Sequence, residues 1–116
     1  MTPTEFNLAR RVNTQVNREI TYMTDREQYG VADYWIHEPA SGFGDCEDYA
    51  LTKFKRLITA GIPRKRMGIY VVWAYFNGYK EGHAVLVIDN RWVLDNVTNT
   101  IRDIKYVNYD VVKILR

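Results

Sequence analysis

The spacing of apolar residues changes near the middle of the chain, and this change restricts the fold more than any other feature. In the first half, apolar side chains recur every four residues from Leu8 to Ile20, which is typical of an amphipathic helix. Beyond Gly61, residues 67–76 (MGIYVVWAYF) are rich in β-branched and aromatic residues, and Asn77-Gly78 favours a hairpin turn. Helices followed by hairpin-linked strands predict an α+β fold with an antiparallel sheet.

The first helix has a clear start signal. Thr2 is expected as its N-cap, Pro3 occupies the first helical position, and Glu5 completes a capping box.

A second helix is expected after the break at Gly42-Phe43-Gly44. Asp45 is a suitable N-cap, Cys46 would be the first helical residue, and Asp48 stands where a capping-box acid belongs. Gly61 would end this helix. We expect Ala50, Phe54, Leu57 and Ile58 to form its buried stripe, and Lys53, Lys55 and Arg56 to face water.

Two further strands are expected at residues 83–88 and 92–95, joined through Asp89-Asn90-Arg91, and a last strand within residues 106–114. Residues 21–43 are polar and rich in aromatic residues but show no clear period. They are expected to form a long structured loop with short helical pieces, and loops of this length often carry function.

Composition excludes several classes of protein. The 116 residues, 47% of them hydrophobic, are enough for one domain spanning residues 1–116 and one core. The net charge is only +2, and the longest basic cluster, Arg64-Lys65-Arg66, is too small for a nucleic-acid binder. No apolar run approaches the roughly 18 residues of a membrane span. The N-terminus lacks the features of a secretory signal, so we expect a cytoplasmic protein as written, or a periplasmic one if a leader was removed.

Cys46 is the only cysteine, so no intramolecular disulfide can form, and it is the candidate nucleophile. A thiol attacks as its thiolate, and the unpaired N–H groups and the dipole of a first helical turn favour negative charge. The same N–H groups could hold the oxyanion of acyl transfer. Asp45, Glu47 and Asp48 oppose the thiolate, so we assign them to capping, structure or metal binding. A buried, inert cysteine is the alternative.

His83 opens an apolar strand, where a protonatable ring needs a partner, whereas His37 lies in a polar loop and is expected at the surface. Asp95 is the candidate partner. Side chains alternate along a strand, so a three-residue loop that pairs Ile88 with Trp92 would place His83 and Asp95 on one face, with backbone positions roughly 7–8 Å apart. A two-residue turn without a bulge would separate them. A core histidine satisfied by a carbonyl is the alternative.

These residues lie in the strings GDCEDYA (residues 44–50), GHAVL (82–86) and VLDN (93–96). Together with DYW (33–35) and AGIP (60–63), they resemble the bacterial transglutaminase-like cysteine proteases, which include the LapG-like periplasmic enzymes that cleave biofilm adhesins. The resemblance runs from Val12 to Asn96. It implies a papain-like/transglutaminase core in which a Cys-bearing helix packs on an antiparallel sheet that carries His and Asp. It also implies a Cys46-His83-Asp95 catalytic triad that works through a thioacyl-enzyme.

The resemblance implies further site residues. Trp35 would donate an indole N–H near the oxyanion, and an aromatic side chain packed over the site is the alternative. Calcium would bind beside the nucleophile through Asp33, Asp45 and Glu47, although Asp45 is also sufficient as a helix cap alone. No cofactor is needed for the bond-breaking chemistry itself.

The leading prediction is therefore a cysteine peptidase that acts on a protein or peptide substrate. Transfer of the same acyl group to an amine, as in transglutaminases, is a second hypothesis. A binding or regulatory module that kept the fold without the chemistry is a third, and the joint presence of Cys46, His83 and Asp95 argues against it. The small size of the chain would fit a phage or mobile-element setting as well as a bacterial one.

Overall fold

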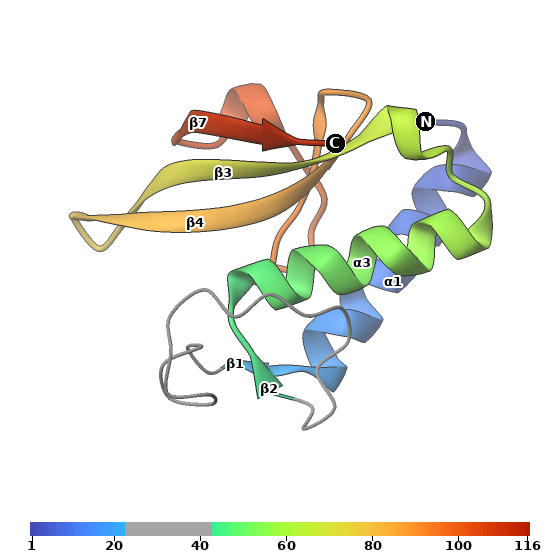
Figure 1. The fold of residues 1–116 in the computed structure, drawn as a ribbon, viewed down its shortest axis with the longest axis horizontal. Helices are drawn as coiled ribbons and strands as arrows, with labels where there is room; N and C mark the ends of the chain where they lie inside the picture. Colours follow the sequence, from blue (N-terminus) through green and yellow to red (C-terminus); the bar gives the residue numbers. More distant parts are fainter. Residues whose placement is uncertain (23–42) are drawn as a thin grey trace.

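The computed structural model describes residues 1–22 and 43–116. Two helices, α1 (Pro3–Glu19) and α3 (Cys46–Ala60), pack together and cover one face of a five-stranded antiparallel sheet (Figure 1). The α+β class predicted from the sequence is confirmed. Among the helices in the described residues, none combines the length and the apolar character needed to cross a membrane.

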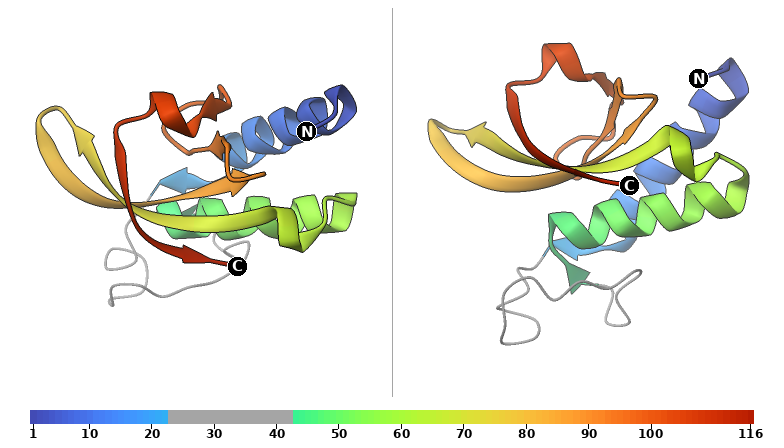
Figure 2. Two further views of the ribbon diagram at one scale, coloured as in Figure 1. Left: turned by 90° about the horizontal axis from the view of Figure 1, so that it is seen from above. Right: turned by 45° about the horizontal axis from the view of Figure 1, so that its top comes forward.

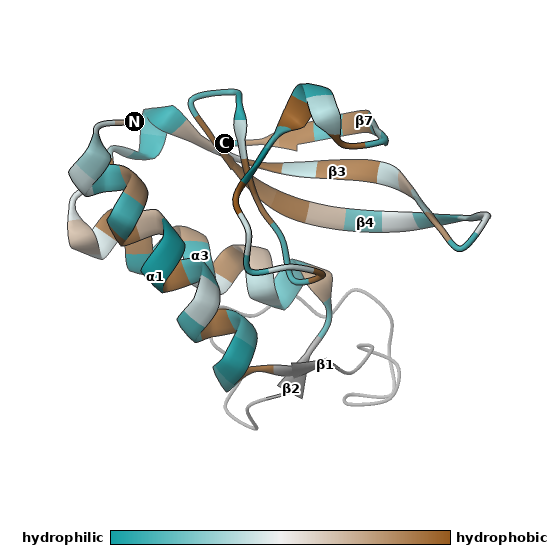
Figure 3. Ribbon diagram, turned by 180° about the vertical axis from the view of Figure 1, so that it is seen from behind, coloured by the Kyte–Doolittle hydropathy of each residue, from teal (hydrophilic) through white to brown (hydrophobic). Residues whose placement is uncertain are grey.

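The strand order is β6-β5-β4-β3-β7. Asn77 and Gly78, both with positive φ, close the long β3–β4 hairpin as a two-residue turn of the favoured type requires. Figure 2 shows this hairpin extending beyond the helices, and Figure 3 shows that its far end is hydrophilic. The strands are β3 (Met67–Phe76), β4 (Tyr79–Ile88), β5 (Trp92–Leu94), β6 (Arg102–Asp103) and β7 (Tyr109–Leu115).

The strand predictions hold in outline, with shifted ends. β3 has the expected bounds, whereas β4 begins four residues before His83 because the tight turn lets the ladder continue to Tyr79. β7 ends one residue beyond the predicted segment, and β6, which pairs with β5, was not expected. Two short 3₁₀ turns, η1 (Arg64–Arg66) and η2 (Ile104–Tyr106), precede β3 and β7.

The predicted loop of residues 21–43 falls largely outside the described residues. Its ends are described: β1 (Thr21–Tyr22) and β2 (Phe43–Gly44) pair in parallel. This pairing brings the end of α1 close to the start of α3.

Both helix starts agree with the sequence. The Thr2 side chain accepts a hydrogen bond from the Glu5 N–H, and the Glu5 carboxylate accepts one from the Thr2 N–H. Asp45 and Asp48 form the same reciprocal pair at the start of α3. Gly61 ends α3 in the left-handed region, with φ at 109°, which glycine adopts without a steric penalty.

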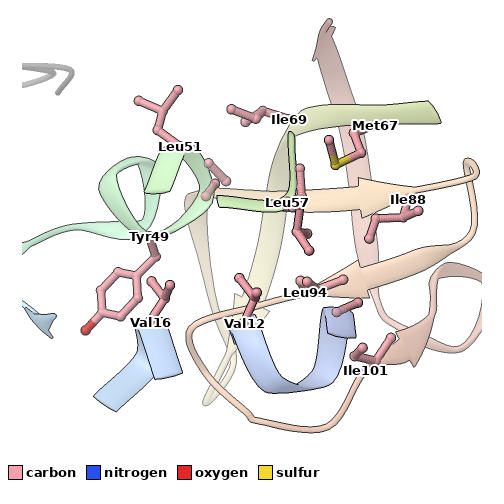
Figure 4. Packing of buried hydrophobic residues seen from close by; sticks show 14 of the residues in the cluster. Val12, Val16, Tyr49, Leu51, Leu57, Met67, Ile69, Ile88, Leu94 and Ile101 are labelled. Atoms are coloured by element: carbon pink, nitrogen blue, oxygen red, sulfur yellow. The ribbon is translucent and has the colours of Figure 1, made fainter. Parts of the chain in front are cut away.

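The main core lies between the helices and the sheet (Figure 4). Here α1 contributes Val12 and Val16, α3 contributes Leu57, and the facing strands contribute Leu86 and Leu94, all buried. The other sheet face has its own apolar cluster under the segment that links β5 to β7, which supplies Ile104 and Val107 as cover. The members of this second cluster are Tyr70, Val72, Val85, Val87 and Val93.

Two assignments on α3 are wrong. Ile58 is 39% exposed rather than buried, and Lys53 is fully buried rather than solvated. The buried stripe instead runs through Cys46, Ala50, Lys53 and Leu57, at spacings of four, three and four residues. These spacings keep all four side chains on one helix face.

We predict that Leu57→Ala lowers the free energy of unfolding by about 2–5 kcal/mol, because Leu57 is fully buried and its removal leaves a cavity. Ile58→Ala, on the neighbouring exposed position, is the matched control and should cost about 1 kcal/mol or less. Urea unfolding followed by circular dichroism measures both. Equal losses for the two variants would contradict this assignment of the core face.

Candidate active site

Cys46 is the first residue of α3, as predicted from the sequence. The Asp45 carboxylate caps this turn and accepts hydrogen bonds from the N–H groups of Glu47 and Asp48. The Asp48 carboxylate in turn accepts from the Asp45 N–H at 3.0 Å. This capping fixes the backbone that carries the cysteine and therefore the position of its sulfur.

The Cys46 sulfur lies against the edge of β4. The backbone N–H of Ala84 donates a hydrogen bond to it. This contact is possible because β5 pairs with β4 only from Leu86 to Ile88, which leaves the earlier part of β4 open on that side. Since Ala84 follows His83 directly, the register of β4 brings the thiol and the imidazole into the same region.

The electrostatics of Cys46 differ from the expectation. Burial raises the pKa of the thiol well above its usual range, and the negative charges of Glu47 and Asp45 raise it further. The thiol also donates to the Glu47 carboxylate, at 3.7 Å from Sγ to Oε2. The start of the helix was expected to lower this pKa. Desolvation and the two adjacent carboxylates act in the opposite direction.

His83 and Asp95 are in direct contact. His83 Nε2 lies 2.7 Å from Asp95 Oδ1, and both side chains are buried. Ile88 pairs with Trp92 across the three-residue loop, so the predicted hairpin register is confirmed. Asp95 itself lies just beyond β5 rather than within it.

The His83 ring is held from several sides. The rings of Phe76 and Tyr109 meet it edge-on, with centroids 5.4 and 5.5 Å away. Because Nε2 faces Asp95, Nδ1 is the ring nitrogen left to exchange a proton with a neighbour. Within the described part of the chain, no hydrogen bond joins this ring to the Cys46 sulfur.

Asp95 accepts hydrogen bonds through both carboxylate oxygens. Oδ1 receives the Val97 N–H in addition to His83, and Oδ2 receives Arg102 Nη2 at 2.6 Å and the Tyr109 hydroxyl. Burial alone would raise the pKa of Asp95, but the hydrogen bonds from His83, Tyr109 and Val97 hold it below its ordinary value. The carboxylate is therefore ionised and fully engaged.

Sequence patterns do not predict the two asparagines on α1 that hold the chain after Asp95. Asn13 is fully buried and donates to the carbonyl of Asn99 at 3.1 Å. Asn17 donates to the carbonyl of Asp95 at 2.9 Å. An asparagine every four residues on the buried side of an amphipathic helix is the signal that could have identified them.

Lys53 is a further buried polar group on α3. It is fully buried, and its Nζ has no hydrogen-bond partner within the described residues. Burial lowers the pKa of Lys53 to about 7, and the negative charge of Asp95 acts in the opposite direction. The amine thus lies close enough to Asp95 to interact with it electrostatically.

The predicted calcium ligands are only partly within the described residues. Asp45 and Glu47 are adjacent in the first turn of α3 and offer the hard oxygen donors that calcium prefers. Asp33 lies outside the described residues, as do Trp35 and His37. Among residues 1–22 and 43–116, no three His, Cys, Asp or Glu side chains cluster closely enough to hold a metal ion. These two carboxylates fit such a site in kind, and calcium would need further oxygens beyond them.

Comparison with known families assigns this arrangement to a class. Residues 1–115 match the family model of the bacterial transglutaminase-like cysteine proteinases (BTLCP), so the chain belongs to this family. The resemblance inferred from the sequence strings is thereby confirmed. A search of curated proteins finds no match.

Among solved structures, the fold is similar to LapG from Legionella pneumophila. One LapG structure aligns with a TM-score of 0.83 and 23% identity, over 97% of this chain and 65% of that one. The calcium-bound and EGTA-treated forms both give 0.79 and 24%, over 93% of this chain and 63% and 61% of theirs. The chain therefore spans less than two thirds of the length of these proteins.

Lys53 leads to a prediction about stability and pH. The unfolded chain keeps this amine protonated up to about pH 10.4, whereas the folded protein releases the proton near pH 7. The unfolded state therefore binds more protons between these values, so the free energy of unfolding should rise with pH across this window and level off below it. Lys53→Met should flatten the rise and stabilise the protein at pH 7 by about 1–3 kcal/mol.

Urea unfolding at several pH values tests this, with Lys65→Met at an exposed position as the control. A Lys53→Met variant that keeps the slope of the parent protein, or is less stable at pH 7, would contradict the prediction.

Proposed function

We propose that this protein is a cysteine peptidase in which Cys46 is the nucleophile, His83 the general base and Asp95 the residue that orients the base. One observation carries the proposal. His83 on β4 contacts Asp95 at 2.7 Å, and the next residue of the same strand, Ala84, contacts the Cys46 sulfur through its backbone N–H. An inert buried cysteine has no need of an oriented, ionisable pair beside it.

In the proposed reaction, His83 Nδ1 accepts the proton of the Cys46 thiol as the sulfur attacks the carbonyl carbon of a peptide bond. The backbone N–H of Cys46 would stabilise the resulting oxyanion, because the N–H groups of Glu47 and Asp48 already donate to the Asp45 carboxylate. His83 then returns the proton to the leaving amine, which departs and leaves a thioacyl-enzyme. Water, deprotonated by His83, hydrolyses the thioester and regenerates the thiol.

Because the pKa of Cys46 is raised, the site must stabilise the thiolate for the reaction to proceed. The thiolate is unfavourable by itself, so it would form together with the imidazolium of His83, which Asp95 stabilises. Asp45 and Glu47, with Asp33, would hold a calcium ion beside the nucleophile, and a bound cation would offset the negative charges that act on the sulfur. The calcium-bound and EGTA-treated structures of LapG support testing this ion first.

Peptidase activity can be tested without knowing the substrate. We expect the wild-type chain, incubated with a mixture of denatured proteins, to create new peptide N-termini that mass spectrometry detects. Cys46→Ala and His83→Ala should create none, and Asp95→Ala should lower the rate by orders of magnitude. Cys46→Ala turnover close to wild type would disprove the mechanism.

The same assay separates the alternatives when a primary amine is added. Amide conjugates at the new C-termini would indicate acyl transfer rather than hydrolysis. A binding module would create neither product, and its Cys46→Ala variant would keep any partner of the wild-type chain.

Glu47 gives a prediction about the thiol itself. Glu47→Gln removes a negative charge that raises the pKa of Cys46, so thiolate formation should move to lower pH. The rate of Cys46 alkylation by iodoacetamide against pH, in the presence of a chelator, measures this. Glu81→Gln, at an exposed position on β4, is the control and should leave the profile unchanged. An unchanged profile for Glu47→Gln would contradict the electrostatic account of this site.

A further inference from the structure

We propose that Arg102 and Tyr109 are positioning residues that fix the Asp95 carboxylate and limit how strongly it favours the protonated form of His83. This inference rests on the proposed function, because it concerns the same Cys–His–Asp group. It adds two residues from β6 and β7, strands that lie outside the elements carrying that group.

The geometry at Asp95 divides the carboxylate into two halves. Oδ1 faces the site and receives His83 and the Val97 N–H, whereas Oδ2 faces away and receives Arg102 Nη2 and the Tyr109 hydroxyl. Arg102 Nη2 also lies 3.3 Å from the Tyr109 oxygen, so the two donors support each other. A carboxylate with donors on both oxygens cannot rotate about its terminal torsion without breaking at least two bonds.

The pairing of the strands places Arg102 and Tyr109 beside the Asp95 carboxylate. Arg102 pairs with Val93 of β5, two residues before Asp95, and Tyr109 is the first residue of β7. The guanidinium also lies over the Tyr109 ring, 5.6 Å from its centroid. The segment between β6 and β7 is therefore joined to the buried aspartate at both of its ends.

The bonds from Arg102 and Tyr109 matter because the charge of Asp95 acts on the neighbouring imidazole of His83. An isolated buried carboxylate would hold a proton on the neighbouring imidazole and leave it unable to accept one from a thiol. The Arg102 cation offsets the charge of Asp95, and the Tyr109 hydroxyl donates a hydrogen bond to the same carboxylate oxygen. Asp95 can then orient the ring through a carboxylate whose charge is partly offset and whose two oxygens are both held.

Within the part of the chain that the structure describes, α3 places two further ionisable groups, Lys53 and Cys46, around this pair. Lys53 interacts electrostatically with Asp95 and acts in the same direction as Arg102 when it is charged. Cys46 lies on the opposite side, against β4. Burial, followed by the bond to Asp95, raises the pKa of Tyr109 to about 12, so its hydroxyl remains a donor at every pH of interest.

The test is an NMR titration of the His83 ring in a chain that carries His37→Gln and Cys46→Ala. His83 is then the only histidine, and coupling to the thiol is removed. Relative to this parent, we expect Tyr109→Phe to move the titration midpoint upward by about half a pH unit, and Arg102→Gln by about one unit. Arg102→Lys, which retains the charge, should stay closer to the parent than Arg102→Gln.

Tyr106→Phe is the matched control, because it removes the same hydroxyl from an 80% exposed side chain nearby. It should not move the midpoint. Circular dichroism establishes folding for each variant, and the conservative Tyr109→Phe and Arg102→Lys carry the test if Arg102→Gln fails to fold. Midpoints of Tyr109→Phe and Arg102→Gln that coincide with the control, or move downward, would overturn the inference.

The titration needs no substrate, so its result is independent of peptidase activity. An upward shift in a chain that cleaves nothing would leave the inference standing and reject the proposed function. An unmoved midpoint in a chain that cleaves peptides would reject the inference and leave the proposed function standing.

Discussion

A buried carboxylate must regain from the protein the hydrogen bonds that it loses to water, and this requirement organises the site around Asp95. Its side chain is inaccessible to solvent and is bonded by His83, Val97, Arg102 and Tyr109. These donors come from β4, the loop after β5, β6 and β7, so a single charge connects four parts of the sheet. Truncation of Asp95 would therefore unpair an arginine and a histidine as well as remove an acid.

The shortness of β5 is the second condition for the site. Its ladder to β4 ends at Leu94, and the open edge beyond it is where the first turn of α3 meets the sheet. A longer β5 would place its own carbonyls against the Ala84 N–H and exclude the Cys46 sulfur. The chain turns away at Asp95 instead, and asparagines on α1 hold the turning segment by its carbonyls.

The sequence predicted those features that depend on local chemistry. The cap at Asp45, the turn at Asn77-Gly78 and the odd loop after Ile88 are each determined within a few residues, so both the start of α3 and the His83–Asp95 register followed. The sequence did not predict Arg102 or the burial of Lys53. Arg102 follows a loop without regular period, so its pairing with β5 beside Asp95 left no pattern in the sequence. Lys53 was assigned to the surface because of its charge, although its spacing from Ala50 and Leu57 placed it on the buried helix face.

The charges near Cys46 and near His83 are balanced in different ways. The fold itself offsets Asp95, because Arg102 is held beside it by the β5–β6 pairing. At the start of α3, the carboxylates of Asp45 and Glu47 still act on the sulfur and raise its pKa. The carboxylate that orients His83 is thus offset by a residue of the sheet, whereas the proposed nucleophile, Cys46, would need a positive charge at the first turn of α3. If calcium supplies that charge, removing it should suppress thiolate formation at Cys46 and leave the titration of His83 in the Cys46→Ala chain unchanged.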